Sequence, residues 1–441
     1  MAPTERREPI EMVDKEDSAA LLDYVGSDLE GGKKSDPGGK MTRWQASASI
    51  MKAVMGAGSF ALPWAFSKMG YVAGPATLLL LMALSVESIK MLVASRRMAL
   101  AASYVEVARA AFGPIGAVLS YAASISASVG VCGSYLVFIA ANVLSLFPSG
   151  SEGGSNGVSQ GVLVFAVLPI AVLLSAVRDV GRLALASLLG DASVILGMLV
   201  VLVYGGAYVE NFGERCVAVA PIASMPLAFG AVGFLFFIHF LVIPIESAMM
   251  RPEEFEDVLN VTFLACAVIS AGFGILGYLF FGEETEQIVI LNVEGSFFVS
   301  AVKILLCIDL LLTYPVVMRP SIEIVEKSLS LVLKRRCAGA RAWACCSTRL
   351  LVCIALGIVA AMASLFVPAF GLLSSLVGGC SQTFLGFIMP PLMMQRMQRQ
   401  RHERSSSYLD AKVLVMVSSG VVLMCWTLHS TWSELQSMDK M

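Results

Sequence analysis

Long apolar stretches alternate with short polar segments along most of the chain. Each stretch is about as long as a membrane-spanning helix, which needs about 20 mostly apolar residues. The stretches are continuously apolar, whereas the strands of a membrane β-barrel alternate apolar and polar positions over about ten residues. The pattern therefore predicts an all-α integral membrane protein with eleven transmembrane helices, at about residues 44–66, 71–95, 118–147, 160–177, 185–209, 223–250, 258–281, 296–318, 348–366, 369–394 and 412–430.

The composition agrees with a chain that lies mostly in lipid. Hydrophobic residues make up 57% of the 441 residues and charged residues only 15%, while soluble domains carry roughly 25% charged residues. This argues against a soluble globular domain and against a nucleic-acid partner, and it makes the lipid bilayer the main partner. Residues 1–43 are polar and glycine-rich, so we expect a disordered cytosolic tail there, followed by a transmembrane domain over 44–430 and a short tail over 431–441.

Basic residues gather in alternate loops, which indicates the orientation because cytoplasmic loops carry the excess of Lys and Arg. With the amino end in the cytosol, the outer segments hold only Lys68, Arg215 and Lys440. The inner loops hold Arg96, Arg97, Arg109, Arg178, Arg182, Arg251, Arg319, Lys327, Lys334, Arg335, Arg336, Arg341, Arg349, Arg396, Arg399, Arg401, Arg404 and Lys412. An odd number of helices then places the carboxyl end outside the cytosol.

Glycine and proline interrupt two of the apolar stretches. In the first, Gly56-Ala57-Gly58-Ser59 precedes Pro63, and in the sixth, Gly230 and Gly233 precede Pro244. The two stretches lie five apart, and paired interruptions in two halves are typical of inverted-repeat transporters that bind substrate near the bilayer midplane. We therefore predict two inverted five-helix repeats and one extra C-terminal helix. The alternative is that these small residues only let two helices pack closely.

A broken helix also leaves backbone groups free to bind a ligand. One end of the break presents free N–H groups with about half a positive charge, and the other presents free carbonyl groups with about half a negative charge. A zwitterionic amino acid matches such a pair of poles. We therefore expect its carboxylate near the N–H groups of Gly58 and Ser59, and its amino group near the carbonyls of Met55, Gly56 and Phe236.

The residues around both interruptions match a known family. The run from Gly56 to Phe66, GAGSFALPWAF, resembles the GxGxLxLPxAF signature of the amino acid/auxin permease family, and the run from Phe234 to Glu246, FLFFIHFLVIPIE, is similar to its FxFxxHxxxLPIE pattern. Residues 277–282 and 367–379 also resemble family stretches in the expected order. This resemblance implies the leucine-transporter fold and secondary active transport of amino acids by alternating access, coupled to protons or sodium.

The candidate substrate-binding residues follow from the breaks and from their neighbours on the third and sixth stretches. They are Met55, Gly56, Ala57, Gly58, Ser59, Gly130, Phe234, Phe236, Phe237 and His239. His239 could serve as a proton switch, because an imidazole titrates near neutral pH, or it could be a packed residue. We expect no catalytic residues, no metal and no cofactor apart from a coupling ion.

Asp309 and Thr313 are the candidate ion-coupling residues. They lie four apart in the eighth stretch and hence on one helical face. The resemblance implies that Thr313 is an ion ligand against the first break. Asp309 could carry a coupling proton or could pair with Lys303, and proton and sodium coupling both remain open.

The main alternative function is a receptor or sensor that binds an amino acid on the same scaffold without transporting it. An enzyme is disfavoured, since the sequence has no metal cluster, no paired catalytic carboxylates and no nucleophile motif. A plasma membrane and a vacuolar or lysosomal membrane are both compatible with the sequence. The identity of the amino acid stays open as well.

Overall fold

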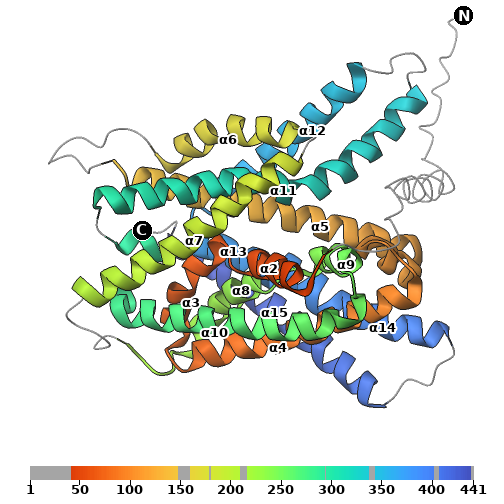
Figure 1. The fold of residues 1–441 in the computed structure, drawn as a ribbon, viewed down its shortest axis with the longest axis horizontal. Helices are drawn as coiled ribbons and strands as arrows, with labels where there is room; N and C mark the ends of the chain where they lie inside the picture. The colour runs from red at the N-terminus through yellow and green to blue at the C-terminus, as the bar shows by residue number, and fades with distance from the viewer. Residues whose placement is uncertain are drawn as a thin grey trace, which may run out of the picture.

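In a computed structural model, the described part of the chain is built from helices and their connections (Figure 1). It covers residues 41–147, 159–177, 180–208, 216–293, 295–336, 343–401 and 407–438. Most of the predicted tail of residues 1–43 and the last three residues lie outside it. The main helices are α2 (Arg43–Val54), α3 (Leu62–Met69), α4 (Ala73–Ala99), α5 (Tyr104–Leu144), α6 (Gln160–Ala176), α7 (Val180–Tyr208), α8 (Met225–Leu235), α9 (His239–Ala248), α10 (Phe255–Phe281), α11 (Phe297–Arg336), α12 (Trp343–Phe366), α13 (Phe370–Val377), α14 (Met389–Gln400) and α15 (Ser407–Met438).

The predicted all-helical, multi-pass class is confirmed. Eight helices among the described residues are long and apolar enough to cross a membrane, and two shorter apolar helices span Gln160–Ala176 and Ala192–Ala207. The first apolar stretch is divided between α2 and α3. The number of eleven membrane crossings and the inverted repeats stay predictions.

Several helices extend beyond the predicted apolar stretches, because a helix can continue in water where its side chains turn polar. Helix α11 runs past residue 318 to Arg336, and α15 runs past residue 430 to Met438. Helix α5 begins well before residue 118, at Tyr104, and is kinked at Gly113, whose φ of 66° suits glycine. Pro114 follows directly, and proline disfavours an α-helical residue before it.

The loops predicted to be cytosolic meet at one end of the bundle. The Glu246 carboxylate accepts hydrogen bonds from Arg96 Nη1 at 3.1 Å and from Arg97 Nε at 3.0 Å, which joins the end of α4 to α9. Arg401, after α14, donates to the Met98 carbonyl at 2.8 Å. Residues predicted to share one side of the membrane are therefore neighbours in the fold.

Two loops predicted to lie on the other side also meet each other. The Tyr71 N–H donates to the Val217 carbonyl at 3.0 Å, and the Ala220 N–H donates to the Met69 carbonyl at 2.8 Å. The segment after α3 and the segment before α8 thus form a short backbone contact. This grouping agrees with the alternation of loops predicted from the charges.

The core surrounds the two helices that the sequence predicts to be interrupted. Helices α2, α3 and α8 lie near the centre in Figure 1, and α4 and α10 run side by side along one edge. Phe60, next to the first interruption, is fully buried, and its ring packs edge-on against Phe138 of α5 at 5.9 Å and Phe273 of α10 at 6.2 Å. The central segments are therefore held by packing on several sides.

Candidate functional site

The first predicted interruption is present. Helix α2 ends at Val54, and a 3₁₀ turn over Ala57–Ala61 separates it from α3. Gly56 has an extended backbone, with φ −124° and ψ −154°. Its carbonyl accepts the Ser59 N–H at 3.0 Å, so the Ser59 N–H, which was predicted to bind the substrate carboxylate, is bonded within the turn instead. The N–H groups of Ala57 and Gly58 donate no hydrogen bond to any described residue. They are unsatisfied donors at the start of a helical segment, where the helix dipole is positive.

The second predicted interruption is present as well. Helix α8 ends at Leu235 and α9 begins at His239, and the residues between them leave the helical conformation, with ψ 9° at Phe236 and φ −119° at Ile238. The first bond of the new turn runs from the Leu241 N–H to the Ile238 carbonyl at 2.8 Å. The break therefore exposes the carbonyl end of α8 and the N–H end of α9.

The two interruptions face each other. A Cβ atom on Gly58 would lie 2.9 Å from Cδ1 and 3.2 Å from Cε1 of Phe234, so only a glycine lets the first break approach the end of α8 this closely. Ser59 beside it is fully buried, and its hydroxyl has no hydrogen-bond partner among the described residues. Buried hydroxyl groups are usually satisfied, so Ser59 Oγ and the free N–H groups are available to a polar ligand.

The other candidate substrate residues are more scattered. The Phe236 ring packs against Phe263 of α10 at 5.6 Å, so this residue offers the break its backbone rather than its ring. Gly130 of α5 lies against α13, where a Cβ atom would clash with the Val377 side chain. Phe237 stacks on His239 with 5.3 Å between ring centroids. The structure thus brings together Gly58 and Phe234, and it places Gly130 in a helix contact.

The candidate ion-coupling pair forms a local contact. Thr313 Oγ1 donates to Asp309 Oδ1 at 3.4 Å, as their spacing predicts. Lys303 was the alternative partner of Asp309. Its Nζ instead donates to Ser145 Oγ of α5 at 3.3 Å. Helix α11 packs mainly against α5 and α7. A role for Asp309 and Thr313 in ion binding stays a prediction.

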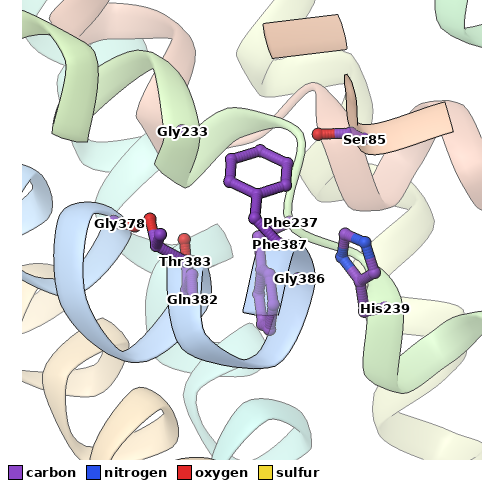
Figure 2. Close-up of a pocket in the computed structure, with 9 residues that line it drawn as sticks. All are labelled: Ser85, Gly233, Phe237, His239, Gly378, Gln382, Thr383, Gly386 and Phe387. Carbon is purple, nitrogen blue, oxygen red and sulfur yellow. Dashed lines mark hydrogen bonds between the residues drawn. The ribbon is translucent and has the colours of Figure 1, made fainter. Parts of the chain in front are cut away.

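A small cavity adjoins the second interruption, and most of its lining residues were not predicted. The space that a water-sized sphere can occupy is about 10 Å³, which is about the minimum that one water molecule needs. Figure 2 shows His239 and Phe237 on one side and the segment between α13 and α14 on the other. The lining residues are Ser85, Gly233, Phe237, His239, Gly378, Gln382, Thr383, Gly386 and Phe387.

The segment between α13 and α14 is π-helical over Gly378–Gln382 and Phe384–Ile388. π-Helical turns are rare and are found frequently at functional sites. The sequence here is an apolar run interrupted by glycines and by Ser381-Gln382-Thr383, and it predicts an ordinary helix. The available signals were the pair Gly378-Gly379 and the polar run Ser381-Gln382-Thr383 within a membrane-spanning stretch.

The comparisons with known proteins assign the family. Residues 39–433 match the family model described as transmembrane amino acid transporter protein. The chain is similar to amino acid transporter AVT3B of Arabidopsis thaliana, with 29% identity over 89% of this chain and 93% of that protein. It is also similar to the vesicular inhibitory amino acid transporter of Macaca fascicularis, with 24% identity over 92% and 78% of the two chains.

Solved structures agree on the fold. A Na⁺-coupled sialic acid symporter in a substrate-bound outward-open state has a TM-score of 0.52 at 14% identity, and 95% of each chain is covered. MhsT in complex with L-phenylalanine has a TM-score of 0.50 at 12% identity, with 90% of this chain and 100% of that chain covered. Identities this low support the arrangement of helices only. From the family match over most of its length, the chain belongs to the transmembrane amino acid transporters, the amino acid/auxin permease family, whose members are transporters rather than enzymes.

Proposed function

We propose that this protein is a secondary active transporter that moves amino acids across a membrane by alternating access. The observation that carries the proposal is the pair of opposed helix interruptions at Gly56–Ser59 and Phe236–Ile238. The substrate carboxylate binds the N–H groups of Ala57 and Gly58 together with Ser59 Oγ. Its amino group binds carbonyl oxygens at the ends of α2 and α8, as the opposite signs of the helix ends require.

The proposed architecture has eleven membrane crossings, ten of which form two inverted five-helix repeats. The two interrupted helices occupy corresponding positions in the two repeats, which is where such transporters hold their substrate. Transport then consists of movement of the first, second, sixth and seventh crossings against the rest. The amino end faces the cytosol, as the basic residues of the inner loops require.

The driving ion is a proton or sodium. Asp309 and Thr313 are the proposed ion-coupling residues by sequence, while His239 offers a titratable group beside the second break. The relatives that are named as vacuolar transporters in Schizosaccharomyces pombe and Saccharomyces cerevisiae support an internal, vacuole-type membrane. In such a membrane the lumen is the side opposite the basic loops.

The direct test is amino acid flux in liposomes that contain the purified protein. A panel of radiolabelled amino acids is offered under an imposed proton gradient, an imposed sodium gradient or neither, and protein-free liposomes serve as the control. We expect accumulation of at least one amino acid that stops when an ionophore dissipates its gradient. Saturable binding without flux under all three conditions would contradict transport and would favour the sensor.

A further inference from the structure

The cavity beside the second interruption contains polar atoms that the proposed substrate site does not use. His239 is 1% exposed and Gln382 is 5% exposed, and both line the cavity (Figure 2). Nδ1 of His239 and Oε1 of Gln382 have no hydrogen-bond partner among the described residues. A buried polar atom without a partner costs about 1–3 kcal/mol, so two of them at one cavity indicate an occupant.

The hydrogen bonds of Ser88 decide which imidazole nitrogen of His239 carries the proton. The Ser88 hydroxyl has one hydrogen, and it donates that hydrogen to the Gly386 carbonyl. The 3.2 Å contact between Ser88 Oγ and His239 Nε2 therefore needs a hydrogen on Nε2. In a neutral imidazole this leaves Nδ1 as the acceptor, so the unpartnered atom is the one that can take up a proton.

The π-helical segment brings its backbone close to this acceptor. A Cβ atom on Gly386 would lie 3.0 Å from Cε1, 3.3 Å from Nδ1 and 3.5 Å from Nε2 of His239, so a side chain there would press on the imidazole edge that holds both nitrogens. The same segment supplies Gln382 and Thr383 to the cavity. A water molecule donates two hydrogen bonds, so water in this cavity supplies the donors that acceptors such as Nδ1 and the Gln382 carbonyl lack.

Charged side chains on the surrounding helices do not line this cavity. Those of α2 and α9 are Arg43, Lys52 and Glu246, and those of α4 are Glu87, Lys90, Arg96 and Arg97. Glu87 is engaged with Lys90 and Lys412, and Glu246 with the two arginines. Near the π-helical segment, the Tyr104 hydroxyl of α5 donates to the Leu385 carbonyl at 2.7 Å, and Cys380 belongs to the segment itself. The other titratable groups on the helices packed against this segment do not line the cavity either; they include Glu106, Arg109, Arg396, Arg399, Asp410, Lys412, Cys425, His429 and Glu434.

We propose that this cavity is a proton-binding site, in which a water molecule bridges Gln382 Oε1 and His239 Nδ1 and His239 accepts the coupling proton at Nδ1. The proposal rests on the proposed transport function and selects the proton as its driving ion. In the step itself, a hydronium ion gives its proton to the Nδ1 lone pair and leaves a water molecule. The imidazolium then donates from Nε2 to Ser88 and from Nδ1 toward the water and Gln382.

The position of His239 couples this proton to helix movement. It is the first residue of α9, on the interruption that also contributes to the proposed substrate site. A positive charge there is disfavoured by the N-terminal end of α9 and favoured by the carbonyl end of α8. Protonation of His239 therefore changes the electrostatic interactions of the imidazole with α8 and with α9. These two half-helices form the sixth crossing, which alternating access has to move.

The test compares His239→Gln with His429→Gln in proteoliposomes. Glutamine can still donate to Ser88 but takes up no proton near neutral pH, while His429 is exposed on α15 and serves as the matched control. We expect His239→Gln to lose proton-driven accumulation by tenfold or more, and we expect the amino acid exchange that remains to be independent of pH. His429→Gln should match the unmodified protein in both assays.

A second variant covers the case in which His239→Gln does not fold. Gln382→Leu removes the partner of the bridging water and keeps the size of the side chain, so the pH for half-maximal accumulation should move to more acidic values. Proton-driven accumulation with an unchanged pH profile in the folded variants would overturn the proton site alone, as would accumulation driven only by sodium. Absence of amino acid exchange by the unmodified protein would overturn the proposed function and this inference together.

Discussion

At the scale of single residues, the site depends on side chains that are absent or small. Gly58 has no Cβ, and this lets the first interruption touch the Phe234 ring at the end of α8. Ser59 adds one hydroxyl without filling the gap. A polar ligand can therefore reach backbone groups that a larger side chain would cover.

We expect Gly58→Val to reduce amino acid uptake strongly while the protein still reaches the membrane. The added carbons would overlap the Phe234 ring, and overpacking of this kind costs about 1–3 kcal/mol. Relief of the overlap moves the first break away from the end of α8, so the backbone donors lose their position for the substrate. The measurement is uptake into proteoliposomes at equal protein content. Gly272→Val is the matched control, because a Cβ at Gly272 of α10 meets nothing within 4 Å. Equal uptake by both variants would remove Gly58 from the site.

The residues of the two breaks were predictable because glycine and proline act on the backbone locally. Gly56, Gly58 and Pro63 indicate the first interruption from the local sequence alone. Contacts between distant helices carry no such local signal. The cavity partners Gln382 and His239 come from the tenth and sixth stretches, and nothing in either stretch alone identifies the other. Gly130 was assigned to the site as a small residue, but the structure uses its small size for packing against Val377.

At the scale of elements, a buried ionic contact ties α4 to the second half of the broken sixth helix. Glu246 is fully buried, and its two oxygens accept hydrogen bonds from Arg96 and Arg97. Arg96 also donates to Ser247 Oγ at 2.9 Å. The short helix α9 is thus held at its far end by α4, while its first residue lies at the break.

We expect Glu246→Gln to lower the melting temperature of the purified protein. The substitution keeps the shape but removes the charge from two hydrogen bonds, and a hydrogen bond to a charged group contributes about 1.5–3 kcal/mol. The arginine side chains are 24% and 43% exposed, so solvent screening brings the expected loss to about 1–2 kcal/mol. Glu253→Gln, at an exposed position before α10, should leave the melting temperature unchanged. If Glu246→Gln and Glu253→Gln have equal melting temperatures, the contact of Glu246 with Arg96 and Arg97 does not stabilise α9.

Elements were predictable where hydrophobicity alone defines them, and their ends were not. The apolar stretches identify the part of each helix that lies in lipid. Helices α5 and α11 continue beyond these stretches with polar residues, which apolar length cannot indicate. Hydrophobicity does not indicate the π-helical turns between α13 and α14 either, because they change the hydrogen-bond register without changing the residue types.

At the scale of the whole molecule, the loops that the basic residues assign to one side of the membrane also contact each other in the fold. Loops that the basic residues assign to the cytosol meet through Arg96, Arg97 and Arg401, and two loops assigned to the opposite side meet through Tyr71 and Ala220. A single error in the predicted order of helices would have mixed the two groups. The grouping of these loops was therefore predictable from the alternation of charged loops, whereas the packing angles of the helices were not, and the number of crossings and their orientation stay predictions.

The central claim is that free backbone N–H groups at the first interruption bind the carboxylate of an amino acid. Backbone amide hydrogen exchange at Ala57 and Gly58 tests it most directly, with and without a transported amino acid, and with the amides in the middle of α10 as the reference. We predict that both amides exchange readily in the free protein and become protected when the amino acid binds, while the reference amides stay unchanged. Binding of the amino acid with no change in exchange at Ala57 and Gly58 would contradict the account.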